Sequence, residues 1–233
     1  MPWDFWVIFL VLGVLIPWRG QVRLRRLLVL PRMNTKDKLT LYGSTIAFQW
    51  ILLGLVAWRA LARGLTIAQL GLSREFTLGL ALTAAAGAGL LGFLQWINLR
   101  RVARLSGPVS ELMRKLAERL LPTSGLEYAP YCALSLTAGV CEEFLYRGFA
   151  MSALSRAGVA TWMVVVITSV LFGLAHAYQG KSGIIGTSLM GFVLAGGRLW
   201  TESLIPAMVW HSAVDIAAGI AGPKHFVLGR EER

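Results

Sequence analysis

Charged side chains are scarce in this sequence. Asp, Glu, Lys and Arg make up 15% of its 233 residues, while hydrophobic residues make up 56%. A soluble domain of this size would carry about a quarter charged residues, so the shortage excludes an ordinary soluble domain. Apolar runs of roughly 17–21 residues recur along the chain, each close to the length that a helix needs to cross the hydrocarbon core. We therefore expect an all-α fold, a polytopic transmembrane helical bundle.

Cysteine is rare as well, with Cys132 and Cys141 the two in the chain. Nine residues apart on one helix, they would point to roughly opposite faces. They cannot bridge each other, so a disulfide framework is excluded. A positively charged leader is also missing, and the first apolar run contains Asp4, so the sequence does not predict a cleavable signal peptide.

No linker rich in Pro, Gly or Ser divides the chain, so we expect a single integral membrane domain over residues 1–233. We expect about seven spans plus amphipathic interfacial helices. The basic stretch 19–38 is predicted to lie partly on the bilayer surface, and apolar residues at helical spacing predict an amphipathic helix within 103–125. Small residues cluster at 84–92 and 183–197, where they would let helices approach closely. The expected spans are residues 3–18, 41–58, 77–97, 128–155, 161–178, 183–199 and 203–221.

The formal net charge of +11 would suit a nucleic-acid-binding protein, but its basic residues flank the apolar runs. No basic surface interleaved with aromatic residues is present outside the spans, so we expect no nucleic-acid partner. Basic loops instead attract anionic lipid and set topology. The odd-numbered connections and the C-terminal tail carry most of the positive charge. We therefore expect the N-terminus outside and the C-terminus in the cytoplasm.

The expected spans nevertheless contain ionisable residues, which at mid-helix cost about 2.5–3.5 kcal/mol for an Asp, Lys or Arg. Such residues are a functional hypothesis by default. Glu143 and Arg147 are separated by four residues, so they can form an ion pair, which leaves Glu142 to point elsewhere. The intramembrane polar residues are Glu142, Glu143, Arg147, His176, His211 and Asp215.

Three short motifs within these spans resemble those of a known family, the CAAX prenyl protease and bacteriocin-processing (CPBP, or Abi) intramembrane proteases. The motif Glu-Glu-x-x-x-Arg is present as EEFLYR, Phe-x-x-x-His as FGLAH, and His-x-x-x-Asn/Asp as HSAVD. The last ends in Asp where prenyl-processing members have Asn. The resemblance places the catalytic core at about 127–221 and leaves 1–126 as accessory spans and basic loops. It implies a membrane protease, which we expect in a bacterial inner (plasma) membrane.

The resemblance implies hydrolysis of a membrane-anchored protein or peptide near its C-terminus. Glu142 would act as the general base that takes a proton from water, and His176 would help to hold that water. His211 would donate a hydrogen bond to the oxyanion of the tetrahedral intermediate. Asp215 would orient His211 or the water.

Three further residues would support the site structurally: Glu143, Arg147 and Phe172. A catalytic zinc is the alternative, with ligands from Glu142, Glu143, His176 and His211. The sequence contains no H-E-x-x-H motif, and the arginine already engages one carboxylate, so we favour no cofactor and keep zinc open. An ion-coupled transporter and a non-catalytic immunity or scaffold protein are the other classes, although no internal repeat supports a transporter.

Overall fold

The computed structural model describes residues 1–29, 33–72 and 75–227. Helices account for nearly all of these ranges, and no strand occurs within them. The all-α fold expected from the sequence is therefore confirmed. The helices are α1 (Trp3–Leu10), η1 (Val11–Leu15), α2 (Ile16–Val29), α3 (Thr35–Ala62), α4 (Leu78–Arg104), α5 (Pro108–Leu120), α6 (Gly125–Glu143), η2 (Phe144–Ala150), α7 (Met151–Arg156), α8 (Thr161–Ala175), η3 (Ala177–Gln179), α9 (Gly180–Thr201) and α10 (Ile205–Phe226).

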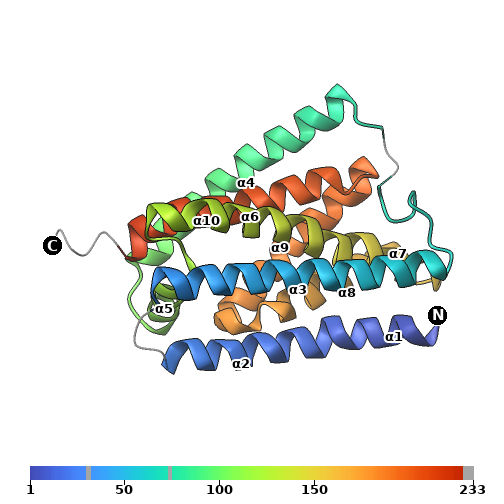
Figure 1. The fold of residues 1–233 in the computed structure, drawn as a ribbon. Coiled ribbons are helices and arrows are strands. Elements are labelled where there is room, and N and C mark those ends of the chain that lie inside the picture. The colour runs from blue at the N-terminus through green and yellow to red at the C-terminus, as the bar shows by residue number, and fades with distance from the viewer. Residues whose placement is uncertain (30–32, 73–74, 228–233) are drawn as a thin grey trace.

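Figure 1 shows long rods that run back and forth across the molecule, with the N-terminus at one end and the last turn of α10 at the other. Five of these rods are long and apolar enough to cross a membrane. Two more expected spans are helical: α8 is a shorter apolar helix, and α6, η2 and α7 form one continuous rod. The protein is thus a helical integral membrane protein with five candidate spans in the described ranges. The candidate spans are Trp3–Val29, Thr35–Ala62, Leu78–Arg104, Ala177–Thr201 and Ile205–Phe226.

The first rod extends further than the sequence suggested. Helix α2 continues α1 and η1 without a break to Val29, so residues 19–29 of the basic stretch prolong the first helix, while residues 35–38 begin α3 (Figure 1). Residues 30–32 of that stretch lie outside the described residues. The wide π-helical turn η1 ends two residues before Pro17, which has no N–H to give the preceding turn and whose ring crowds the carbonyl four residues earlier. The widened turn accommodates the proline while the helix continues.

Small residues allow α4 and α9 to pack against α10, as the two clusters predicted. A Cβ on Gly87 of α4 would lie 2.2 Å from Trp210 Nε1, and one on Gly197 of α9 would lie 2.4 Å from the same indole ring. The indole N–H in turn donates to the backbone carbonyls of Thr83 and Ala84. Trp210 therefore fills the space that the missing side chains leave, and it fixes α10 between its neighbours.

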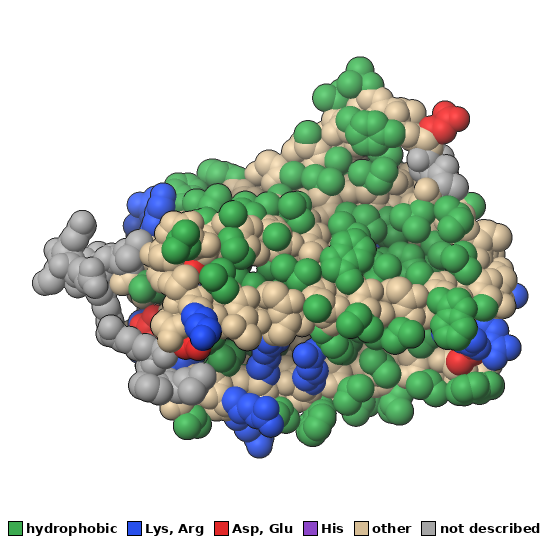
Figure 2. All heavy atoms as spheres, in the orientation of Figure 1, with side chains coloured by type: hydrophobic (Ala, Val, Ile, Leu, Met, Phe, Trp, Pro, Cys, Tyr) green, Lys and Arg blue, Asp and Glu red, His purple; other side chains and the backbone are tan. Residues whose placement is uncertain are grey.

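The hydrophobic side chains that face outward fit a lipid environment. Figure 2 shows them spread over the central part of the visible face, with Lys and Arg gathered toward the left-hand end and a smaller group at the right-hand end. Exposed tryptophans include Trp3, Trp58 and Trp200. Aromatic residues of this kind sit at the boundary between lipid and water.

A buried ion pair fastens α3 to the beginning of α6. The Lys38 ammonium lies 3.1 Å from Glu127 Oε2, and both side chains are about 2% exposed. Lys38 also donates to Leu121 O, while Glu127 accepts from Thr35 and from the Thr123 N–H. The pair closes the end of the bundle beside the amphipathic helix α5, which lies where the sequence predicted one.

Candidate functional site

The Glu-Glu-x-x-x-Arg motif spans the junction between α6 and the π-helical segment η2. Glu143 is the last residue of α6, and Arg147 lies inside η2. Arg147 Nη1 donates to Glu143 Oε1 over 2.8 Å, and both side chains are fully buried. The ion pair predicted from the four-residue spacing is therefore confirmed. A single π-helical turn inside an α-helix frequently marks a functional site, and sequence spacing alone did not predict this one.

Glu143 has a second partner that the sequence did not predict. His211 Nδ1 lies 2.8 Å from the same oxygen, Glu143 Oε1, which joins α10 to the motif helix. A carboxylate oxygen accepts hydrogen bonds, so Nδ1 carries the proton and donates it. The other imidazole nitrogen, Nε2, points away from Glu143. Glu143 thus holds both Arg147 and His211 in fixed orientations.

Glu142, the neighbouring carboxylate, points toward a different set of groups. Its Oε1 accepts a 2.7 Å hydrogen bond from Gln49 Nε2 of α3. Its other oxygen, Oε2, lies 4.0 Å from His176 Nε2. The Glu142 and His176 side chains are 21% and 16% exposed, whereas Glu143 is fully buried. The two adjacent glutamates therefore differ in environment, and the more accessible one faces an imidazole across a gap.

His176 has a fixed orientation because it follows the end of α8 and bonds back to that helix. Its Nδ1 lies 2.9 Å from the backbone oxygen of Phe172. A carbonyl can only accept, so Nδ1 donates and the Nε2 that faces Glu142 is free to accept when the ring is neutral.

Phe172 connects the two imidazoles and the arginine. Its ring centroid lies 4.8 Å from that of His176 and 5.5 Å from that of His211, the latter edge-on. The Arg147 guanidinium lies 4.4 Å from the centre of the same ring, within the range of a cation–π interaction. The three motifs thus meet around one buried phenyl ring.

Asp215 lies one turn after His211 on α10, as the spacing predicted. Its Oδ2 is 3.8 Å from His211 Nε2, too far for a direct hydrogen bond. Its side chain is 36% exposed and borders the site on the more open side. Its expected influence on His211 stays a prediction, whereas the direct hydrogen bond to His211 comes from Glu143.

One of the four residues named as possible zinc ligands, Glu143, already accepts hydrogen bonds from two other side chains. Within the ranges that the structure describes, no three His, Cys, Asp or Glu side chains converge in a way that could hold a metal ion. Both Arg147 and His211 Nδ1 already donate to Glu143, and Gln49 donates to Glu142. A tetrahedral zinc needs three protein ligands with free lone pairs, and Glu142 Oε2, His176 Nε2 and His211 Nε2 are the atoms that could still offer them.

Together these contacts define a cluster of ionisable groups enclosed among membrane helices, the setting of an intramembrane enzyme. A comparison with protein families agrees: residues 125–217 match the Rce1-like family, described as type II CAAX prenyl endopeptidase Rce1-like. The match spans all three motifs, so the resemblance to the CPBP proteases is confirmed, and this family implies a membrane protease, a hydrolase. No curated protein and no solved structure gives a significant match to the chain.

Gln49 is the site residue that the sequence analysis missed. It lies outside the matched segment, in the middle of the second expected span, and it is nearly buried. An amide in the middle of an apolar span was the available signal, because such a group needs a hydrogen-bonding partner in lipid. The sequence could not say which helix supplies that partner.

Proposed function

We propose that the protein is an intramembrane endopeptidase that cleaves a membrane-associated protein or peptide near its C-terminus with a water activated by Glu142. The observation that carries the proposal is the 4.0 Å gap between Glu142 Oε2 and His176 Nε2. One water with hydrogen bonds of about 2.8 Å to both atoms fits such a gap. The water would donate one proton toward each group, and its lone pair would face the substrate.

The reaction then follows ordinary acid–base chemistry. Glu142 takes a proton as the water oxygen bonds to the scissile carbonyl carbon, and the carbonyl oxygen becomes an oxyanion. When the intermediate collapses, the C–N bond breaks and the proton on Glu142 passes to the departing amine. Gln49 holds Glu142 by its other oxygen, so Oε2 stays directed at the water.

His211 is the proposed partner of the oxyanion. This role needs its doubly protonated form, in which Nδ1 donates to Glu143 and Nε2 donates to the oxyanion. The carboxylates of Glu143 and Asp215 on the two sides of the ring balance that positive charge. A preorganised donor of this kind contributes about 2.7–4 kcal/mol to transition-state stabilisation.

The substrate is proposed to reach the site within the bilayer, because no described segment forms a separate recognition domain. We place the protein in a bacterial inner membrane, with the N-terminus outside and the C-terminus in the cytoplasm. The basic loops would contact anionic lipid, and no nucleic acid is involved.

Comparative membrane proteomics tests the proposal. Cells that carry the intact protein are compared with cells that carry Glu142→Gln at equal membrane abundance, and a peptide-level search looks for a precursor that keeps its C-terminal segment. We expect at least one such precursor to accumulate with the variant. Identical C-terminal peptides in the two strains would contradict the proposal and favour a non-catalytic scaffold or a transporter.

A second measurement, on the purified protein, distinguishes the glutamate mechanism from the zinc alternative. Metal content by elemental analysis and cleavage after dialysis against a chelator are measured on the same sample. The glutamate mechanism predicts full cleavage without stoichiometric zinc. Loss of cleavage with the metal, and its return with added zinc, would instead support the metalloprotease.

A further inference from the structure

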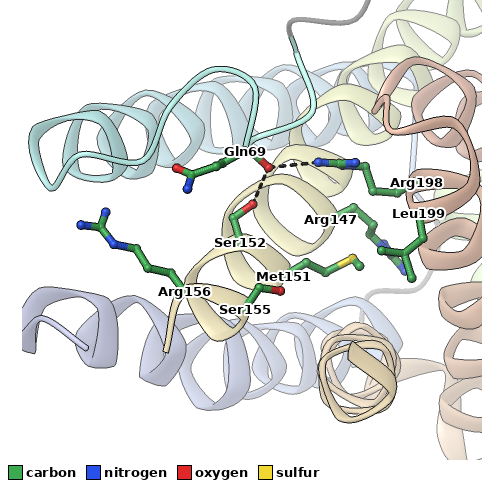
Figure 3. A pocket seen from close by; sticks show the side chains of 8 residues that line it. All are labelled: Gln69, Arg147, Met151, Ser152, Ser155, Arg156, Arg198 and Leu199. Carbon is green, nitrogen blue, oxygen red and sulfur yellow. Dashed lines mark hydrogen bonds between the residues drawn. The ribbon is translucent and has the colours of Figure 1, made fainter. Parts of the chain in front are cut away.

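A cavity lies at the end of the bundle nearest the N-terminus. Its volume is about 320 Å³, and it is bordered by the loop that contains Gln69, by the η2–α7 segment and by the end of α9. Figure 3 shows Ser152 and Arg198 converging on the backbone carbonyl of Gln69 from two different helices. The described residues that line the cavity are Gln69, Arg147, Met151, Ser152, Ser155, Arg156, Arg198 and Leu199.

The lining of this cavity is positively charged. Three of its eight residues are arginines, and none is acidic. Glu143 balances Arg147, and Glu202 lies within electrostatic reach of Arg198. The charge that remains is positive. Such a cavity favours an anion.

The nitrogens of Arg147 and Arg198 differ in their hydrogen-bond partners. Arg147 is fully buried and uses Nη1 and Nη2 for Glu143 and Gly191, while its Nε has no hydrogen-bond partner among the described residues. The buried Arg198 Nε likewise has none there, although Nη2 donates to Gln69 O. Both Nε atoms are enclosed by protein, so a ligand in the cavity would contact the outer guanidinium nitrogens, above all those of the exposed Arg156.

The surroundings indicate that the anion belongs to a lipid. Met151 and Leu199 add apolar surface to the lining, and the next residue, Trp200, is exposed as in an interfacial belt. Gly71, with φ +78°, lets the loop backbone pass the Arg198 guanidinium, because a Cβ there would lie 2.4 Å from Arg198 Nε. We propose that this cavity binds the phosphate group of an anionic phospholipid at the membrane face opposite the basic loops.

Lipid retention by the purified full-length protein tests this proposal independently of proteolysis. The protein is prepared in three samples: detergent micelles with phosphatidylglycerol, micelles with phosphatidylcholine, and micelles without phospholipid in a buffer that contains inorganic phosphate. Bound molecules are counted by native mass spectrometry. The test variants are Arg198→Gln and Arg156→Gln, and the Arg156 side chain is the exposed one of the two. Arg101→Gln is the matched control. It removes the same charge from an exposed position near the C-terminal end of α4, a helix that contributes no residue to the cavity lining.

We expect the unmodified protein to retain phosphatidylglycerol in preference to phosphatidylcholine. Each test variant should weaken retention by about tenfold, the size expected for one charge-assisted hydrogen bond, while the control stays within about twofold. Equal loss in Arg101→Gln, or unchanged retention in both test variants with intact helicity, would overturn the proposal. Binding of inorganic phosphate without retention of phospholipid would overturn the lipid assignment.

Discussion

Gln49 Nε2 donates a 2.7 Å hydrogen bond to Glu142 Oε1 and thereby joins an accessory helix to the motif helix. The family match covers residues 125–217, so this contact reaches the proposed base from outside the matched segment. Glu142 has no comparable hydrogen bond to Arg147, which is engaged by Glu143. The accessory helix α3 is therefore part of the site.

The first prediction concerns this positioning contact. Gln49→Leu should lower kcat by about 10- to 100-fold, because a hydrogen bond to a charged group contributes about 1.5–3 kcal/mol. KM should stay nearly constant, since the amide bonds to Glu142 rather than to substrate. Trp50→Phe is the control, because it removes a neighbouring hydrogen bond from α3 to α6, from Trp50 Nε1 to Thr137 Oγ1. Equal kcat losses in both variants would mean that the effect is general helix packing.

The buried ion pair gives the second prediction. Arg147→Met leaves the Glu143 carboxylate buried without its cation, which should lower the free energy of unfolding by about 3–5 kcal/mol. The double variant Glu143→Gln/Arg147→Met removes both charges and should recover part of that loss. Thermal unfolding in detergent measures both variants. A double variant no more stable than the single one would contradict the uncompensated-charge explanation.

The third prediction tests the contact between α4 and α10. Gly87→Ala places a methyl group 2.2 Å from Trp210 Nε1 and should destabilise the protein by about 1–3 kcal/mol, the usual cost of overpacking. Gly89→Ala, two residues later, is the control, since nothing lies within 4 Å of its added Cβ. That variant should be neutral or slightly stabilising. Similar melting temperatures for both variants would show that α4 does not pack closely on α10.

The fourth prediction concerns pH and the Lys38–Glu127 pair, which lies at the end of the bundle. Burial would raise the pKa of Glu127, but hydrogen bonds from Thr123, Thr35 and Lys38 outweigh it and lower the pKa to about 2. A carboxyl group with a lowered folded-state pKa stabilises the protein above its unfolded value of 4.5, and this contribution is lost as pH falls toward 2. The advantage of the unmodified protein over Glu127→Gln should therefore shrink between pH 5 and about pH 3.

Melting temperatures at a series of pH values measure this difference. Glu118→Gln serves as the control, because it removes a carboxylate that is 37% exposed on α5. An equal change in Glu118→Gln would show a general effect of losing one carboxylate rather than a property of Glu127. A Glu127→Gln difference that stays constant down to pH 3 would contradict the assigned pKa.

The sequence predicted the features that depend on spacing within one helix. The Glu143–Arg147 pair is such a feature, because residues four apart on a helix are neighbours whatever surrounds them. The apolar runs likewise predicted where the helices lie, since their lengths are set by the bilayer. The match to the protease family confirmed what the three motifs indicated.

Contacts between distant segments could not be predicted in the same way. The hydrogen bonds from Gln49 to Glu142 and from His211 to Glu143 depend on how α3 and α10 are rotated and shifted against α6. That register is fixed by side-chain packing across the bundle, for instance by Trp210 against Gly87, and not by periodicity. The extension of the first helix to Val29 was missed because basic residues interleaved with leucine also suit a surface-lying helix.

Cleavage by Glu142→Gln in proteoliposomes tests the central claim most directly. The substrate is the precursor identified by proteomics, and Glu75→Gln, which makes the same change at an exposed loop residue, is the control. We predict that Glu142→Gln loses at least about 100-fold in kcat, the low end for removal of a general base, while its melting temperature and Glu75→Gln activity stay near those of the unmodified protein. A folded Glu142→Gln protein that cleaves the precursor at the unmodified rate would contradict the account.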